Sequence, residues 1–342
     1  MTYEEILKSA RGQMGPFCKA CPVCNGFACK NQIPGPGAKG TGSVFMRNYQ
    51  KWQEICVNLD TIGDHTPANP TFSLFGKQFS IPVFAAPVGA MQLHYGDKYD
   101  DLAYNQILVS ACAENGIAAF TGDGTNPAVF ESAANVIGQN GGMGIPTVKP
   151  WDPKTLNDRL KLAEKANPLA VAMDIDAAGL PFLKNLNPPA GRKTVEELRE
   201  IIHMTEKPFF LKGIMTVKGA EKALEAGASG IVVSNHGGRV LDGCPATAEV
   251  LPQIADAVGS KMTILVDGGI RSGLDVFKAL ALGADGVLIG RPFVTMVYGG
   301  GKEGIKTYVE KLRAELCDTM ELCGAHTLGE IDRSMIFKTA SC

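Results

Sequence analysis

The chain has 342 residues, of which 45% are hydrophobic, so it is long enough to bury one large core or two smaller ones. Its formal net charge of −2 and pI near 6.2 give no reason to expect nucleic acid or an anionic membrane as a partner. No apolar run reaches the roughly 18 residues of a membrane-spanning helix, and the polar, acidic residues 1–6 are unlike a signal peptide, so a cytoplasmic protein is expected.

The first distinctive segment is a cluster of thiols. Residues 4–14 are amphipathic and predict a surface helix. A C-x2-C-x2-C-x4-C pattern follows, made by Cys18, Cys21, Cys24 and Cys29. Thiols at this spacing can converge on one centre, and in a reducing compartment clustered cysteines are more often metal ligands than disulfides. Three interpretations stay open: a 4Fe–4S cluster, a structural zinc, or thiols without a metal.

Residues 31–45 are rich in glycine and proline and therefore predict an irregular loop. We place the domain boundary at its end. Residues 1–45 form an N-terminal cysteine-rich segment with this loop, and residues 46–342 form the main domain.

From residue 81 onward, short apolar runs rich in valine and isoleucine alternate with stretches of helical periodicity. The apolar runs cover residues 81–87, 116–121, 144–149, 169–176, 209–214, 230–236, 263–269 and 286–290. The helical stretches include residues 154–166, 195–204, 217–226 and 273–282, and further helices are predicted within residues 299–335. Eight strand–helix units predict an α/β protein of the (β/α)8 TIM-barrel class with an N-terminal cysteine-rich extension.

The densest chemistry follows the sixth apolar run. Residues 231–233 predict a buried strand, which ends in Ser-Asn-His-Gly-Gly-Arg at residues 234–239. The glycines let the backbone turn sharply, so that His236 and Arg239 bring a titratable base and a fixed cation close together. An isolated Ser-Asn-His is more often a hydrogen-bonded loop histidine than a catalytic one.

Two further turns predict a phosphate site. In a barrel of this class a phosphate commonly docks after strands seven and eight. Gly268 and Gly269 expose N–H groups ahead of a predicted helix. Arg271 and Arg291 can each form bidentate hydrogen bonds to an anion. A purely structural turn would account for the glycines but not for two arginines at matching strand ends.

Several of these segments resemble the FMN-dependent 2-hydroxy acid oxidases and dehydrogenases, the family of glycolate oxidase, lactate oxidase and flavocytochrome lactate dehydrogenase. The resemblance rests on residues 209–214, 234–239, 241–243, 245–247, 266–273 and 289–292. It is strong from about residue 205 to the C-terminus. It implies noncovalently bound FMN and oxidation of a small (S)-2-hydroxy acid, of the lactate or glycolate type, to the 2-oxo acid.

The resemblance also implies roles for individual residues. His236 would take the substrate's hydroxyl proton during hydride transfer to flavin N5, or the α-proton in a carbanion route. Asp174 would orient His236, with Asp176, two residues later on the same face of an extended strand, as the alternative. Arg239 would bind the substrate carboxylate, and Lys212 would stabilise the negative charge that gathers at the N1–C2 edge of reduced flavin.

The residues expected to bind the flavin come from several strand ends. They are Ala86, Pro87, Thr121, Lys212, Ser234, His236, Gly237, Asp267, Gly268, Gly269, Arg271, Gly290 and Arg291.

The chain departs from the family pattern where the family uses tyrosines. Pro34 and Val148 stand at these two positions, which predicts a substrate larger than, or shaped differently from, lactate or glycolate. We expect a homo-oligomeric dehydrogenase that passes electrons to an acceptor protein. Two other classes stay open: an FMN barrel enzyme of different chemistry, such as an isopentenyl diphosphate isomerase, and a non-catalytic flavin- or metal-binding sensor.

Overall fold

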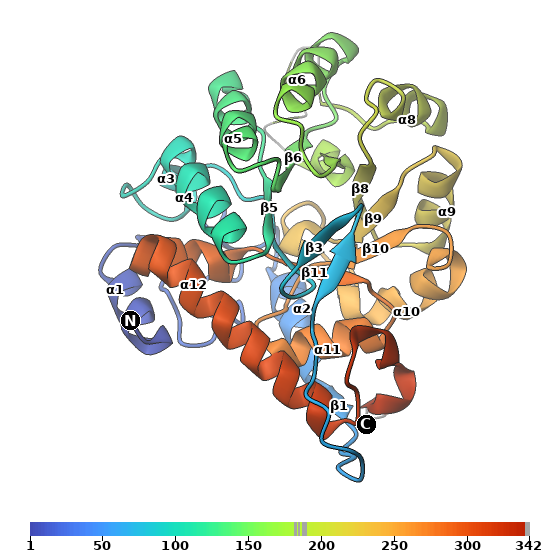
Figure 1. The fold of residues 1–342 in the computed structure, drawn as a ribbon. Helices are drawn as coiled ribbons and strands as arrows, with labels where there is room; N and C mark the ends of the chain where they lie inside the picture. The colour runs from blue at the N-terminus through green and yellow to red at the C-terminus, as the bar shows by residue number, and fades with distance from the viewer. Residues whose placement is uncertain (181–182, 184, 187–189, 339–342) are drawn as a thin grey trace.

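In the computed structural model, which describes residues 1–180, 183, 185–186 and 190–338, eight parallel strands close into a barrel in the order β10-β11-β4-β5-β6-β7-β8-β9. The strands are Val83–Ala85 (β4), Ala118–Thr121 (β5), Gly144–Val148 (β6), Val171–Asp174 (β7), Phe209–Ile214 (β8), Gly230–Val233 (β9), Thr263–Val266 (β10) and Gly286–Ile289 (β11). One strand lies inside each predicted apolar run, so the predicted (β/α)8 barrel is confirmed (Figure 1).

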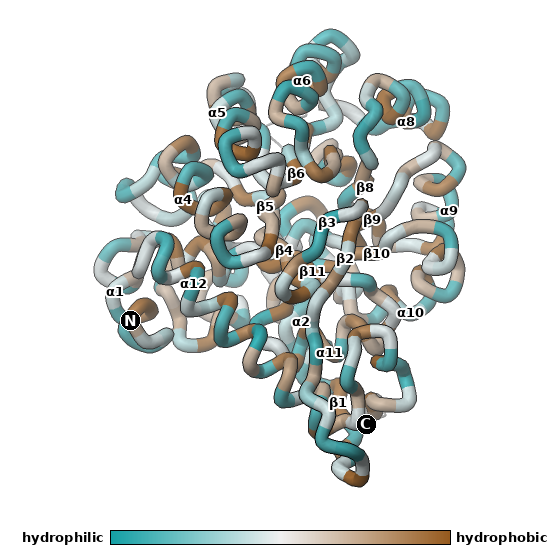
Figure 2. The backbone as a smooth tube through the Cα atoms, viewed as in Figure 1, coloured by the Kyte–Doolittle hydropathy of each residue, from teal (hydrophilic) through white to brown (hydrophobic). Residues whose placement is uncertain are grey.

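Helices surround the barrel and turn their apolar faces towards it (Figure 2). They are α4 (Asp101–Glu114), α5 (Pro127–Gln139), α6 (Pro153–Lys165), α8 (Val195–Ile202), α9 (Val217–Glu225), α10 (Thr247–Val258), α11 (Gly273–Ala281) and the long α12 (Arg291–Leu322). Many begin at a capping side chain; Asp152, for example, accepts the N–H groups of Lys154 and Thr155 at the start of α6. The shorter helices are α3 (Met91–His94) and the single turns η1 (Ile175–Gly179), η2 (His236–Gly238), η3 (Leu328–Glu330) and η4 (Arg333–Met335).

A hairpin closes the N-terminal end of the barrel. It consists of β2 (Phe72–Leu74) and β3 (Lys77–Phe79), which pair antiparallel. Phe79 packs on Phe84 of β4 with ring centroids 5.3 Å apart, and Phe75 packs on Phe210, the second residue of β8, at 5.7 Å. Because this end is filled by aromatic rings, the opposite end, at the carboxyl ends of the strands, is the one left for a site.

The N-terminal residues pack against the barrel rather than apart from it. Helix α1 (Tyr3–Arg11) confirms the predicted surface helix, and it buries Ile6, Leu7 and Ala10 against the main core beside α12 (Figure 1). Helix α2 (Ser43–Gln53) follows the glycine-rich loop, and β1 (Ile55–Val57) pairs antiparallel with β12 (Ile336–Lys338).

The division into residues 1–45 and 46–342 stays a prediction, and residues 339–342 of the second part lie outside the described residues. No helix in the described part of the chain is both long enough and apolar enough to span a membrane.

Candidate active site

A cleft of about 320 Å³ opens at the carboxyl ends of the barrel strands. Most of the predicted site residues line it: Ala86, Pro87, Lys212, His236, Gly237, Arg239, Asp267, Gly268, Gly269, Arg271, Gly290 and Arg291. Thr121, Ser234 and Asp174 are buried. The structure therefore brings residues from distant parts of the sequence together in one place.

The turn after β9 is held from both sides. The Ser234 hydroxyl accepts the backbone N–H of His236 at 3.0 Å, and the side-chain amide of Asn235 exchanges two hydrogen bonds with that of Asn48 on α2, at 2.8 and 2.9 Å. His236 itself has a positive φ of 56°, a conformation that non-glycine residues rarely adopt. Such strain persists only where the surroundings impose it, and it is common at functional sites.

The partner of the histidine is Asp176. Its Oδ1 lies 3.0 Å from His236 Nδ1. The assignment of Asp174 as the carboxylate that orients His236 is therefore corrected to the alternative, Asp176. A neutral His236 that donates from Nδ1 to Asp176 keeps Nε2 free to accept a proton.

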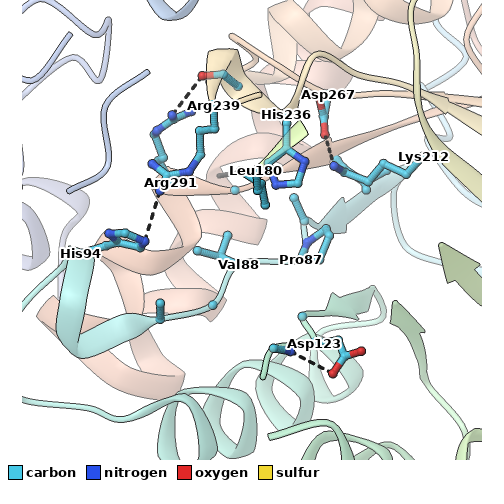
Figure 3. A pocket seen from close by; sticks show the side chains of 18 of the residues that line it. Pro87, Val88, His94, Asp123, Leu180, Lys212, His236, Arg239, Asp267 and Arg291 are labelled. Atoms are coloured by element: carbon cyan, nitrogen blue, oxygen red, sulfur yellow. Dashed lines mark hydrogen bonds and ion pairs between the residues drawn. The ribbon is translucent and has the colours of Figure 1, made fainter. Parts of the chain in front are cut away.

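Asp174 instead belongs to a row of alternating charges. Its Oδ2 accepts a hydrogen bond from Lys149 Nζ at 2.6 Å, and its Oδ1 lies 2.9 Å from Lys212 Nζ. Lys212 Nζ also lies 3.7 Å from Asp267 Oδ2 (Figure 3). Burial by itself would raise the pKa of Asp174, but Lys149 and Lys212 outweigh it and hold that pKa far below its usual range.

The same two effects act on the neighbours of Asp174. Burial would lower the pKa of Lys212, but Asp174 and Asp267 outweigh it, so the pKa is raised and the lysine stays charged. Burial raises the pKa of Asp267, and Lys212 offsets only part of this rise. The row therefore holds a buried, charged lysine against the wall of the cleft.

Three arginines at the other side of the cleft are bound by backbone carbonyls of the N-terminal segment. Arg239 Nη1 donates to the carbonyls of Gly35 at 2.8 Å and Gly37 at 3.0 Å. Arg291 Nε donates to Pro36 O at 2.6 Å, and Arg271 Nε donates to the carbonyl of Cys24 at 2.8 Å. The glycine-rich loop and the cysteine segment thus contact the arginines of the site directly.

His94 adds a neutral group next to Arg239. Burial, together with Arg239 and Arg291, lowers the pKa of His94 to about 4. Its Nδ1 accepts the N–H of Gly35 at 2.9 Å, and its Nε2 lies 3.1 Å from Arg239 Nη2 (Figure 3). Burial beside Arg291 also lowers the pKa of Arg239, to about 10, which leaves it protonated at neutral pH.

Lys149 and His94 also line the cleft, although they were not among the site residues predicted from the sequence. Lys149 had a visible signal, because it is a cation at the end of a predicted buried strand, as Lys212 is. His94 had none, since it lies in the four-residue helix α3 and meets Arg239 only through the fold.

The four N-terminal cysteines lie in an irregular stretch between α1 and α2. Burial raises the pKa of Cys18 to about 12 and that of Cys29 to about 11. Over the described residues, Asp174, Asp176 and His236 are the one group of three or more metal-ligating side chains whose atoms all lie within 4.8 Å of one another. The thiols are therefore not gathered as closely as ligands of a single ion.

The cleft has the features expected of a site for a large phosphorylated cofactor. Thr121 Oγ1 and Asp267 Oδ1 are buried without a hydrogen-bond partner among the described residues, and buried polar atoms are rarely left in that state. Arg271 and Arg291 line the same cleft as Gly290, close to the N-terminus of α12. The residues present thus fit FMN, with a carboxylate oxygen of Asp267 that is unpaired within the described chain and the cations Arg271 and Arg291 lining the cleft.

Comparison with known proteins agrees with this site. A family model described as FMN-dependent dehydrogenase matches residues 36–185 and 185–338. The chain is 32% identical over 326 residues to peroxisomal (S)-2-hydroxyacid oxidase GLO3 of Arabidopsis thaliana, which covers 84% of this chain and 86% of that protein. It is 47% identical over 151 residues to peroxisomal (S)-2-hydroxy-acid oxidase GLO4 of Oryza sativa subsp. japonica, which covers 44% of this chain and only 40% of that protein.

The solved structures agree as well. The crystal structure of mandelate oxidase is similar to this chain with a TM-score of 0.80 and 28% identity, covering 99% of this chain and 98% of the other. The family model spans most of the chain, and the similarity to the Arabidopsis protein extends over more than four fifths of it. The chain belongs to the family of FMN-dependent dehydrogenases.

Proposed function

We propose that this protein uses FMN to oxidise a small (S)-2-hydroxy acid to the corresponding 2-oxo acid. The observation that carries the proposal is the pairing of His236 with Asp176 in a cleft that Arg239 and Lys212 also line. This arrangement offers a base, a cation for a carboxylate and a buried cation for a reduced cofactor. Relatives named as (S)-2-hydroxyacid oxidase and 4-hydroxymandelate oxidase support the same substrate class.

The residues divide the chemistry between them. Bound FMN would accept the two electrons of the oxidation. His236 would take the hydroxyl proton at Nε2 and become an imidazolium. Asp176 would stabilise this cation through its hydrogen bond with Nδ1. Lys212 would place its charge beside the cofactor, where negative charge develops on reduction.

Arg239 would bind the substrate carboxylate. Its Nη1 is already bound by the carbonyls of Gly35 and Gly37, so the guanidinium is held in place before substrate arrives. The carboxylate contact would then use Nε and the second N–H of Nη2, whose other contact is His94 Nε2 at 3.1 Å. Prior fixation lowers the entropy lost on binding.

The test of the proposed function is an anaerobic mixing experiment. Purified protein with bound FMN is mixed with (S)-lactate, glycolate or (S)-mandelate, and the visible absorption of oxidised flavin is followed. Bleaching by at least one of these acids is expected. Bound FMN that none of them reduces would favour a non-catalytic sensor or an isomerase-like enzyme instead.

The phosphate assignment makes a separate prediction. Arg291→Ala and Arg271→Ala should each weaken FMN binding by about 10- to 150-fold, because a charge-assisted hydrogen bond contributes about 1.5–3 kcal/mol. Equilibrium dialysis of FMN against the apoprotein measures this, with the exposed Arg192→Ala as the matched control. Unchanged affinity for FMN in both site variants would show that these arginines do not bind its phosphate.

We also propose that Cys18, Cys21, Cys24 and Cys29 hold a 4Fe–4S cluster. Within residues 16–29 there is a single backbone–backbone hydrogen bond, from Asn25 N to Val23 O, so little of this segment's order comes from its own backbone. A metal centre would supply the missing cross-links.

The positions of the thiols do not match a tetrahedral zinc site. A tetrahedral zinc with bonds of about 2.3 Å holds its sulfur ligands ~3.8 Å apart, and no three thiols of the described chain are gathered within 4.8 Å. A four-iron cluster is larger and spaces its thiolates more widely.

The location of the cysteines suggests what a cluster would do. The carbonyl of Cys24 binds Arg271 at the proposed phosphate site, and Cys29 opens the turn that ends at Gly37, beside Arg239 and Arg291. A cluster there would give electrons a path from FMN to an acceptor protein. A protein with such a route would be a dehydrogenase rather than an oxidase. The metal-binding thiols would also require a reducing compartment, and we therefore propose a cytoplasmic location. A homo-oligomer is part of the same proposal.

Protein purified without oxygen should therefore contain about four irons and four sulfides per chain. Cys21→Ser should abolish them and leave FMN bound, whereas the exposed Cys56→Ser should change neither. Metal and sulfide analysis with an absorption spectrum gives the answer. Stoichiometric zinc, or no metal in anaerobic protein, would contradict the cluster.

A further inference from the structure

Lys149 is a buried cation of the cleft to which the proposed chemistry gives no role. It follows β6 directly, is 7% exposed and lines the same cleft as Lys212 and His236. Its Nζ donates to Asp174 Oδ2 at 2.6 Å. A lysine buried to this degree needs an anionic partner, and Asp174 is the partner that it has.

The backbone of Lys149 is fixed independently of its side chain. Its N–H points to Asp123 Oδ2 at 3.4 Å, and the same carboxylate oxygen accepts the indole N–H of Trp151 at 2.5 Å. Arg159 Nε lies 3.4 Å from the other oxygen of Asp123. This second buried network holds the start of the loop after β6, so Lys149 is not a surface side chain that happens to reach inwards.

The pairing follows the strand order. Lys149 follows β6, Asp174 ends β7 and Lys212 lies in β8, so the charges alternate across three neighbouring strands. Asp174 and Lys212 are register partners in the parallel pair β7–β8. Asp267, after β10, completes the row on the far side of Lys212 at 3.7 Å.

The charges in this row determine how strongly the positive charge of Lys212 acts on the proposed FMN site. With Lys149 present, two cations face two carboxylates. Without it, Lys212 alone would face both Asp174 and Asp267, and the row would carry a net negative charge next to the cofactor site. In a buried site, where screening is weak, this difference acts over several ångströms.

We propose that Lys149 is a positioning residue that acts through Asp174: it neutralises this carboxylate so that the charge of Lys212 favours reduction of bound FMN. The inference rests on the proposed FMN site beside Lys212. It adds to that proposal a residue that tunes the cofactor through its neighbours Asp174 and Lys212.

The redox potential of bound FMN tests the inference. In Lys149→Met the equilibrium constant for two-electron reduction should fall at least tenfold, which is about 30 mV for a two-electron couple. Lys149→Arg should keep the wild-type potential, and the exposed Lys154→Met is the matched control. The double variant Lys149→Met/Asp174→Asn, which removes one charge of each sign, should recover most of the loss.

Two outcomes would overturn it. One is an unchanged potential in Lys149→Met, above all if the KM for the hydroxy acid rises instead, because Lys149 would then bind substrate directly. The other is a double variant no better than the single one, because the effect would then not pass through Asp174. If Lys149→Met does not retain FMN, Lys149→Gln, which keeps a hydrogen-bond donor but no charge, gives the same comparison.

A second measurement uses the FMN-free protein. Urea unfolding of wild type, Lys149→Met, Asp174→Asn and the double variant forms a double-mutant cycle. The two single changes should each destabilise the fold, and the double change should cost clearly less than their sum. Additive effects would rule out the pairing, whereas failure of the wild-type protein to bind FMN would contradict the proposed function and leave the result of this cycle standing.

Discussion

Replacement of His236 by alanine is expected to slow the reduction of bound FMN by substrate by about a hundredfold to ten-thousandfold, the usual contribution of a positioned general base. The alanine variant should still bind FMN, because the phosphate is assigned to Arg271 and Arg291. Anaerobic stopped-flow measurement of flavin bleaching gives the rate. The exposed His203→Ala provides the matched control, since it removes an imidazole that lies outside the cleft.

The same experiment separates the two aspartates near the histidine. Asp176→Asn should also slow reduction strongly, because the amide cannot stabilise the imidazolium and can favour the wrong tautomer. Near-normal reduction rates in both His236→Ala and Asp176→Asn would remove this pair from the mechanism.

Arg239→Lys is expected to raise the KM for the hydroxy acid by about 10- to 150-fold, because lysine loses at least one charge-assisted hydrogen bond of about 1.5–3 kcal/mol to the carboxylate. It also loses the contacts that hold the guanidinium on Gly35 and Gly37, so the cation is less well fixed. Steady-state kinetics over a wide substrate range separates KM from kcat.

A neutral analogue gives the control for this prediction. A 2-hydroxy amide cannot form the ion pair, so the two proteins should differ little in how weakly they bind it. An unchanged KM for the acid in Arg239→Lys would contradict the carboxylate assignment.

The barrel could be predicted from the sequence because parallel strands buried on both faces are short, apolar and rich in β-branched residues. All eight runs are short and mainly apolar, and several of them, such as residues 230–236 and 263–269, are rich in β-branched residues. The hairpin β2–β3 escaped notice, because strands of three residues are too short to show an alternating pattern and this pair is recognised only by its packing on Phe84 and Phe210.

The choice between Asp174 and Asp176 shows what limits sequence reasoning at the site. Two residues apart on an extended strand, they would lie on the same face. However, β7 ends at Asp174 and the chain enters the single turn η1 at Ile175, so Asp176 leaves the strand and meets His236, while Asp174 stays in register with Lys212. Where a strand ends to within one residue is not encoded in an apolar pattern.

Contacts between distant segments could not be predicted at all. Arg239 is 204 residues from Gly35, and the sequence contains nothing that pairs a guanidinium with a backbone carbonyl at that separation. The resemblance supplied a role for Arg239, but the carbonyls that hold it became visible only in the fold.

The central claim is that the protein oxidises an (S)-2-hydroxy acid and that bound FMN is reduced in the same step. The most direct measurement is an anaerobic single turnover with each enantiomer of a chiral 2-hydroxy acid, in which reduced FMN and the 2-oxo acid are both quantified. The account predicts one 2-oxo acid for each FMN reduced with the (S)-enantiomer and little or none with the (R)-enantiomer. Reduction of FMN without formation of 2-oxo acid, or equal reaction of both enantiomers, would contradict it.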